Sequence, residues 1–275
     1  MSGIWVARTP ARTLVAVVVV CGVLAGCGKG GGGGGSVPTA PTGPTSTGGP
    51  STPTTASDGT ILLQNLPLDL SALDYAAIAA LRAGRDADWL PVDDYGRVLP
   101  ASSARPMAQT NPQAVFHAVL GTPVLAVVSG TVTSIPTLYS NDFSVMIASS
   151  GQGGTWEHEH VMNVRVRVGD RVTAGQQIAD VSDFECAWGR SGNPADPICQ
   201  SRLGLVELGL LYGGTTPMHR CPFEPEVVDP SKQADIFAQL TSARTRIKAA
   251  FGSPSLFGES SWATPQCVTL SRVSG

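Results

Sequence analysis

The sequence predicts a mainly β protein, in which a wrapped antiparallel sheet carries flanking helices. From Thr122 onward the chain consists of short, valine-rich segments separated by glycine, asparagine and aspartate, a texture typical of strands joined by tight turns. The pairs Gly169-Asp170 and Ala174-Gly175 mark two such turns in a small barrel-like sheet. A long amphipathic segment at residues 231–251 predicts a helix that lies beside the sheet.

Each expected element follows from local pattern. Strands are expected at residues 123–128, 130–135, 143–148, 155–161, 177–181 and 203–210. A first helix is expected at residues 71–83, and residues 86–115 are expected to be irregular. In the helix at 231–251, Ile236, Leu240 and Ile247 lie on one face, and Gly252 ends the helix.

The N-terminus has the pattern of a bacterial export signal. Arg8 and Arg12 precede an apolar run at residues 13–25, which is shorter than the roughly 20 residues that a spanning helix needs. The run ends in Leu-Ala-Gly-Cys at residues 24–27, which resembles the lipobox of bacterial lipoproteins. We therefore expect a signal peptide at residues 1–26 and a lipid on Cys27. The alternative is an ordinary secretory signal with a chance cysteine.

A tether is predicted at residues 27–58. This segment consists of glycine, serine, proline and threonine with few apolar side chains, so it cannot bury enough surface to offset the entropy of ordering. A flexible chain of about 30 residues reaches roughly 30 Å. The expected location is the bacterial cell membrane or the outer membrane, with the folded part facing the periplasm or the exterior. The absence of aspartate directly after Cys27 favours the outer membrane in a two-membrane bacterium.

The remaining chain is divided by pattern into three segments: a helical and irregular extension at residues 59–110, a β domain at 111–222, and a C-terminal helix with a tail at 223–275. The net charge is -3 and only 14% of residues are charged. This balance excludes a nucleic-acid partner that binds through basic residues. No second apolar run is long enough to span a membrane.

Four cysteines remain after the signal and the lipid site, and an even number in an oxidising compartment predicts two disulfides. Three pairings are compatible with the sequence, and we favour Cys186–Cys199 together with Cys221–Cys267. A structural zinc site with four cysteine ligands is the alternative. The spacings contain no C-x-x-C pair, which disfavours it.

Two motifs of the β region carry a family resemblance. The chain reads Gly-Thr-Pro-Val-Leu-Ala-Val-Val-Ser-Gly-Thr-Val from residue 121 and Val-Gly-Asp-Arg-Val-Thr-Ala-Gly-Gln-Gln-Ile from residue 168. Over residues 111–212 this resembles the lysostaphin-type (LytM-like) zinc endopeptidases of peptidoglycan. The second motif also occurs in biotinyl and lipoyl domains. Covalent biotin or lipoyl attachment is excluded, because no lysine lies between Lys29 and Lys232.

The resemblance implies a zinc site whose ligand positions have changed in this chain. The family's first histidine and its aspartate fall at Asn111 and Val115, and the two histidines of its H-x-H motif fall at Leu203 and Leu205. A catalytic zinc needs three protein ligands and an open position. Because the two leucines lie at i and i+2 on a strand, they share a face and are expected to fill the former metal site with hydrocarbon.

Two candidate site residues match the family's pattern. His160, in Thr-Trp-Glu-His-Glu-His at residues 155–160, occupies a catalytic position and is interpreted as vestigial, and Glu207 matches a glutamate that follows the H-x-H motif. His158 and His160 are expected to share a strand face, and His117 is expected to point the same way. A relocated metal site formed by His117, His158 and His160 is one interpretation. The other is that they are ordinary half-exposed strand residues.

These observations favour a lipid-anchored envelope protein whose peptidase-like domain is not catalytic, needs no cofactor, and binds peptidoglycan or an envelope protein. The first alternative is an active endopeptidase that binds zinc through relocated ligands. The second is a non-enzymatic adaptor module with a wrapped sheet. The expected partners are thus the membrane, through Cys27, and the murein layer or a cell-wall protein, with no nucleic acid.

Overall fold

The computed structural model describes residues 55–56, 59–80, 92–96, 98–99, 109–148, 153–187, 195, 199–200, 202–213 and 218–251. The chain divides into a unit at residues 1–47 and a compact unit at residues 48–275. The predicted signal peptide, Cys27 and most of the predicted tether lie outside the described residues. Among the helices that the structure describes, none is long and apolar enough to cross a membrane.

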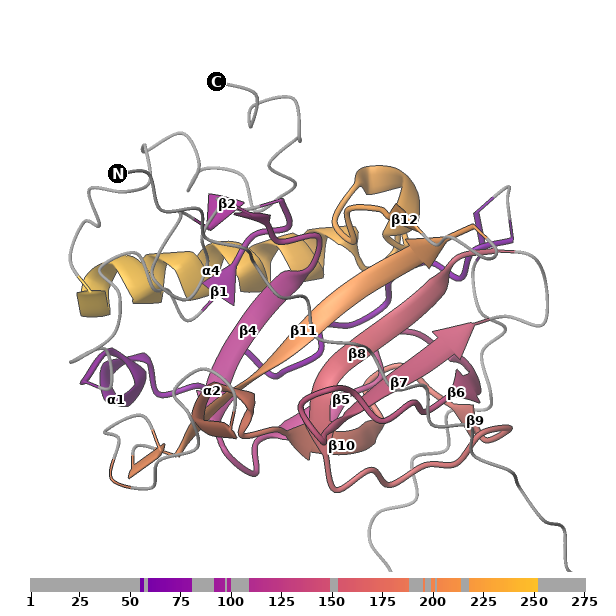
Figure 1. The fold of residues 1–275 in the computed structure, drawn as a ribbon. Coiled ribbons are helices and arrows are strands. Elements are labelled where there is room, and N and C mark those ends of the chain that lie inside the picture. The colour runs from indigo at the N-terminus through magenta and orange to yellow at the C-terminus, as the bar shows by residue number, and fades with distance from the viewer. Residues whose placement is uncertain are drawn as a thin grey trace, which may run out of the picture. The chain divides into compact units, whose positions relative to one another are not determined.

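A ten-stranded sheet forms the centre of the folded unit, in the order β1-β4-β11-β8-β7-β6-β9 (Figure 1). Off this path, β10 pairs with β5 and β8, and β12 pairs with β11. Every pair is antiparallel, which confirms the predicted fold class. The strands are β1 (Val92–Asp93), β4 (Ala114–Val119), β5 (Pro123–Leu125), β6 (Gly130–Ser134), β7 (Phe143–Ala148), β8 (Thr155–Met162), β9 (Arg171–Val172), β10 (Gln177–Val181), β11 (Leu203–Tyr212) and β12 (Met218–His219).

The six predicted strands are all present, but the strands between residues 86 and 115 were not predicted. β7 and β10 have the predicted bounds, and β5, β6, β8 and β11 differ from theirs by one to three residues. Residues 86–115, expected to be irregular, contain β1, the start of β4, and the two-stranded sheet of β2 (Val98–Leu99) and β3 (Gln109–Thr110). All residues of β4 except Val119 are buried, so its sequence shows no alternation.

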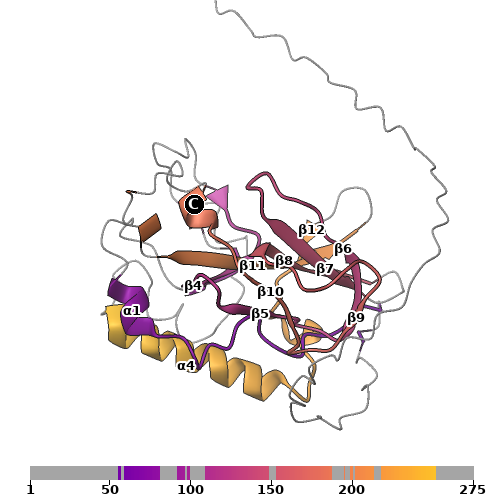
Figure 2. The ribbon, with the colours of Figure 1, turned by 90° about the horizontal axis from the view of Figure 1, so that it is seen from below.

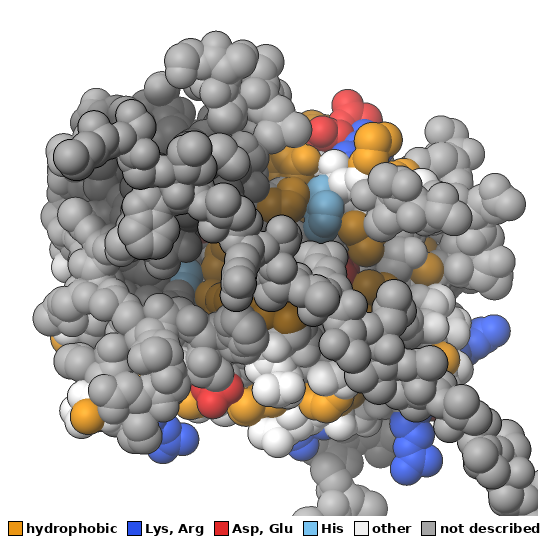
Figure 3. Space-filling model, in the orientation of Figure 1, with side chains coloured by type: hydrophobic (Ala, Val, Ile, Leu, Met, Phe, Trp, Pro, Cys, Tyr) orange, Lys and Arg blue, Asp and Glu red, His pale blue; other side chains and the backbone are white. Residues whose placement is uncertain are grey.

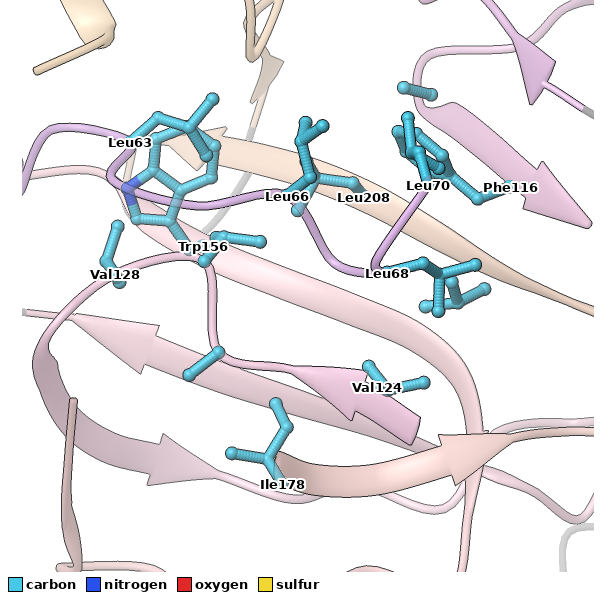
Figure 4. Close-up of a cluster of buried hydrophobic side chains, with 14 of the residues drawn as sticks. Leu63, Leu66, Leu68, Leu70, Phe116, Val124, Val128, Trp156, Ile178 and Leu208 are labelled. Carbon is cyan, nitrogen blue, oxygen red and sulfur yellow. The ribbon is translucent and has the colours of Figure 1, made fainter. Parts of the chain in front are cut away.

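An N-terminal strap, residues 61–70, lies against the back of this sheet. Figure 4 shows its leucines beside Trp156, Phe116 and Leu208. The strap backbone forms hydrogen bonds with other segments. The Leu63 amide donates a hydrogen bond to Val227 O over 2.8 Å, and Trp156 Nε1 donates one to Ile61 O over 2.6 Å. The extension predicted at residues 59–110 therefore shares one core with the β domain.

Two helices cover the strap side. α1 (Tyr75–Ala80) begins after Asp74, whose carboxylate accepts a hydrogen bond from the Ala77 amide at 3.0 Å. α4 (Gln233–Phe251) buries Ile236, Leu240 and Ile247, as the sequence predicts. Figure 2 shows α4 running along the sheet, with the strap between them. Two short helices, α2 (Phe184–Ala187) and η1 (Pro225–Val227), were not expected.

One glycine allows β11 to pass close to the segment after β10. A Cβ atom on Gly204 would lie 1.8 Å from the carbonyl oxygen of Ser182, a distance that no side chain tolerates. The neighbouring Leu205 forms a β-bridge with Ser182. This contact brings Ser182 to the site described below.

The structure contains the predicted disulfide between Cys186 and Cys199, with an S–S distance of 1.98 Å and Cα atoms 4.8 Å apart. It closes a short loop between α2 and β11. Cys221 is also disulfide-bonded and is buried in the core. Cys267, its predicted partner, lies outside the described residues.

Replacing Leu66 with alanine tests whether the strap belongs to the core. Leu66 is fully buried, so Leu66→Ala is expected to lower the free energy of unfolding by about 2–5 kcal/mol. Denaturant titration followed by tryptophan fluorescence measures it. Val168→Ala, at an exposed residue, is the control and should change stability by less than about 0.5 kcal/mol. An equally small effect at Leu66 would contradict the shared core.

Candidate functional site

The candidate site residues lie in two rows on the face of the sheet that points away from the strap, which we call the front face. Glu207 on β11 lies opposite Glu159 on β8 and Val115 on β4. One step along, Leu205 lies opposite His117. Directly opposed residues of antiparallel strands share a face, so these side chains all lie on the face opposite Leu208 and the strap. The strap passes behind β11 in Figure 1, so this face is toward the viewer.

A β-bulge in β8 decides where His160 points. Val161 pairs with Phe143 and His158 pairs with Val145, so Glu159 and His160 together oppose the single residue Ser144. His160 takes a φ of 57°, in the left-handed region. A bulge interrupts the alternation of side chains. As a result, His160 lies beside Glu159 on the front face, and the prediction that it shares a face with His158 is wrong.

His158 is instead a buried residue of the core. Its Nε2 accepts a hydrogen bond from the Val127 amide at 3.2 Å, and its Nδ1 lies 3.2 Å from Val145 O. The side chain is fully buried. Burial lowers its pKa to about 4, so the ring is neutral at pH 7. A neutral ring with both nitrogens bonded to the backbone cannot bind a metal, so His117, His158 and His160 do not assemble the relocated site that the sequence suggested.

His160 is held by a carboxylate on the loop before β7. Its Nδ1 lies 2.9 Å from Asp142 Oδ2 and 3.4 Å from Ser140 Oγ. Asp142 also accepts hydrogen bonds from Ser140 Oγ and, over 2.6 Å, from Ser182 Oγ. The Phe184 ring lies against the imidazole, with centroids 3.8 Å apart. The ring of His160 is therefore fixed on two sides.

These contacts favour the charged forms of Asp142 and His160. Burial by itself would raise the pKa of Asp142, but hydrogen bonds from His160, Ser140 and Ser182 hold that pKa below its ordinary value. Burial would also lower the pKa of His160, but the hydrogen bond to Asp142 and the charge of Glu207 raise it. The pair is thus a buried ion pair whenever His160 is protonated.

Three glutamates gather on this face. Gln113 donates a hydrogen bond to Glu159 over 2.8 Å, and Ser144 donates one to Glu157 over 3.1 Å. Burial, together with the negative charge of Glu159, raises the pKa of Glu157 to about 8. Burial also raises the pKa of Glu207, against the opposing charge of His160. A regular strand would put Glu157 and Glu159 on the face opposite His158 and His160, so the sequence pattern did not indicate this cluster.

Glu159, His160 and Glu207 come close enough to share an ion. One ligand atom from each lies within 4.8 Å of the others. His160 Nε2 lies 3.9 Å from Glu207 Oε2. Of the candidate residues named from sequence, the structure thus brings together His160 and Glu207, and adds Glu159. His117 lies near enough to Glu207 for its charge to influence that carboxyl group.

The family's zinc position does not fit the residues present. Val115 and Leu205 offer no ligand atom, and Leu203 and Leu205 are 0% and 4% exposed. Asn111 lies at the position that the resemblance gives to the family's first histidine, and it hydrogen-bonds Glu207 instead. This hydrogen bond lowers the pKa of the Glu207 carboxyl group, whereas the larger effect of burial raises it. The replacement of a metal site by hydrocarbon stays a prediction from the family resemblance.

Residues 111–191 match the model of Peptidase family M23, which confirms the lysostaphin-type resemblance. The matched segment runs from Asn111 through β10 and ends before β11. No curated protein matches the chain.

Several solved structures are similar. A mutant catalytic domain of the prophage-encoded M23 protein EnpA from Enterococcus faecalis is 23% identical, with 48% of this chain and 88% of that chain covered and a TM-score of 0.36. LytU is 20% identical, with 54% and 92% covered and a TM-score of 0.38. The catalytic domain of lysostaphin from Staphylococcus simulans is 16% identical, with 48% and 89% covered and a TM-score of 0.33.

The buried His158 predicts a pH dependence of stability. Its pKa is about 4 in the folded chain and has an ordinary value of 6.5 when exposed. Between these values the unfolded chain binds the proton and the folded chain does not, so the contribution of His158 is full above pH 6.5 and is lost as the pH falls toward 4.

The variant His158→Gln removes this ionisation. Its free energy of unfolding should be lower than that of the wild type at pH 7, and the difference should shrink steadily as the pH is lowered to 4. Denaturant titrations at half-unit steps of pH measure it. A difference that stays constant over this range would show that His158 takes up its proton equally in both states.

Proposed function

We propose that this protein is a lipid-anchored envelope protein whose M23 domain binds murein or a cell-wall partner without hydrolysing it. The observation that carries the proposal is the pair of aliphatic residues, Val115 and Leu205, at positions where the resemblance places zinc ligands. Without those ligands, the family's reaction lacks the cation that would polarise the scissile bond and activate water. The domain would then keep the fold but lack the metal ion that catalyses the reaction.

The front face keeps side chains suited to binding. Tyr139 is 65% exposed, and its ring meets both His160 and Phe184 edge-on, with centroids 6.2 Å apart in each case. Exposed aromatic rings bury large areas at little entropic cost when a ligand covers them. Figure 3 shows histidine and hydrophobic side chains on the face in view. A mixed aromatic and polar surface of this kind fits a peptide or sugar ligand.

Binding and hydrolysis are separable in one experiment with isolated murein. The full chain, supplied with Zn²⁺, should sediment with murein sacculi and release no soluble muropeptides detectable by mass spectrometry. Tyr139→Ala should weaken cosedimentation by about 5–10-fold, the loss of roughly 1–1.4 kcal/mol of aromatic contact. Val168→Ala, also at an exposed apolar residue, is the matched control. Equal binding by both variants would rule out this surface.

The alternative function is a zinc endopeptidase with relocated ligands. The set His117, His158 and His160 does not serve, because His158 is bonded to the core backbone. The cluster of Glu159, His160 and Glu207 is the observation that still favours a cation on this face. Release of muropeptides by the zinc-supplied chain would establish hydrolysis and overturn the proposal of a binding module.

The proposed anchor is a lipid on Cys27, at the bacterial cell membrane or outer membrane. It is supported by the lipobox-like Leu-Ala-Gly-Cys and by the tether that follows. Cys27→Ser should abolish incorporation of labelled palmitate and move the protein from the membrane pellet to the soluble envelope fraction. Cys21→Ser, at the other cysteine of the N-terminal segment, is the control for general effects of losing a cysteine. A Cys27→Ser variant that still incorporates palmitate and pellets with membranes would contradict lipidation at this residue.

A further inference from the structure

His160 has the surroundings of a metal-binding histidine. Its Nδ1 faces the Asp142 carboxylate at 2.9 Å, which favours the hydrogen on that nitrogen, so the neutral ring carries its lone pair on Nε2 and a cation would take the place of the proton there. The side chain is only 3% exposed. Among the described residues, Nε2 has no hydrogen-bond partner, and it faces Glu207 Oε2 at 3.9 Å. A nearly buried imidazole whose Nε2 is directed at a carboxylate is an arrangement that a cation would satisfy.

We propose that Glu159, His160 and Glu207 bind a divalent cation of the zinc class. The three residues supply one imidazole nitrogen and two carboxylates, and their ligand atoms lie within 4.8 Å of one another. Tetrahedral zinc at 2.0–2.2 Å places its ligands roughly 3.3 Å apart. The ligand atoms therefore need to move together by up to about 1.5 Å around the ion. Three protein ligands leave a coordination position open.

The hydrogen bond from His160 to Asp142 supplies the outer shell of the site. Metal-binding histidines usually donate their second N–H to a carboxylate, which orients the ring and makes the other nitrogen more basic. Asp142 is itself held by Ser140 and Ser182, so the ring cannot turn away. The ligand set of one nitrogen and two oxygens suits zinc better than magnesium or calcium, which prefer oxygen ligands alone.

This site differs from the zinc site that the family resemblance implies. The implied ligand positions are Asn111, Val115 and Leu205, and none of the three belongs to the proposed set. His160, which the resemblance assigns to catalysis, becomes a ligand here. A cation at this place would neutralise the repulsion between Glu159 and Glu207 and offer its open position to an anionic group, such as a carboxylate of a bound peptide.

Zinc titration of the purified full chain, first stripped with chelator, tests the proposal. We expect about one Zn²⁺ per chain by elemental analysis and a rise in melting temperature with Zn²⁺ but not with Mg²⁺. Glu159→Gln and Glu207→Gln should each weaken zinc binding at least tenfold, and Asp142→Asn should weaken it about 10–100-fold. Glu226→Gln, at an exposed glutamate, is the control and should bind zinc like the wild type.

X-ray absorption of the zinc-loaded wild-type chain keeps the test independent of whether the variants fold. The spectrum should show one imidazole in the zinc shell, with the remaining ligands oxygen. Two or more imidazoles, a sulfur ligand, or less than half an equivalent of zinc would overturn the site. Zinc binding that is unchanged in both glutamine variants would do the same.

The experiments distinguish failure of the proposed cation site from failure of the proposed non-catalytic function. Zinc bound with the expected shell, together with murein binding and no muropeptide release, supports both. Muropeptide release that depends on Glu159 and Glu207 would keep the cation site and overturn the non-catalytic function. Murein binding by a chain that takes up no zinc would overturn the cation site alone.

Discussion

The bulge in β8 is the constraint on which the site depends. It reverses the alternation of the strand between His158 and His160, so one histidine enters the core while the other joins Glu159 on the front face. The left-handed backbone at His160 is unfavourable for a residue with a side chain. The hydrogen bond to Asp142 and the contact with Phe184 hold the residue there.

The bulge also gives His158 and His160 different electrostatic environments, although they are only two residues apart. His158 is neutral because its surroundings offer only backbone groups and hydrocarbon. His160 has a carboxylate on one side and two glutamates on the other, so the charged form is favoured there. The same side chain thus serves packing at one position and charge balance two residues later.

The fold surrounding the site is built from segments far apart in sequence. The strap at residues 61–70 fills the back of the sheet, and α4 closes over it (Figure 2). Gly204 lets β11 approach Ser182, which in turn holds Asp142. The packing that supports the front face therefore lies on the opposite side of the sheet.

The sequence by itself determined the antiparallel β class, most strand positions and the buried face of α4. These follow from periodicity and from aligned motifs, which are local properties. Only the tertiary structure decided that Glu159 joins His160 and Glu207 and that Asp142 holds the histidine. The pattern of apolar residues does not indicate the bulge. Asp142 and Glu207, which contact His160, lie 18 and 47 positions from it along the chain, so local pattern could not pair them.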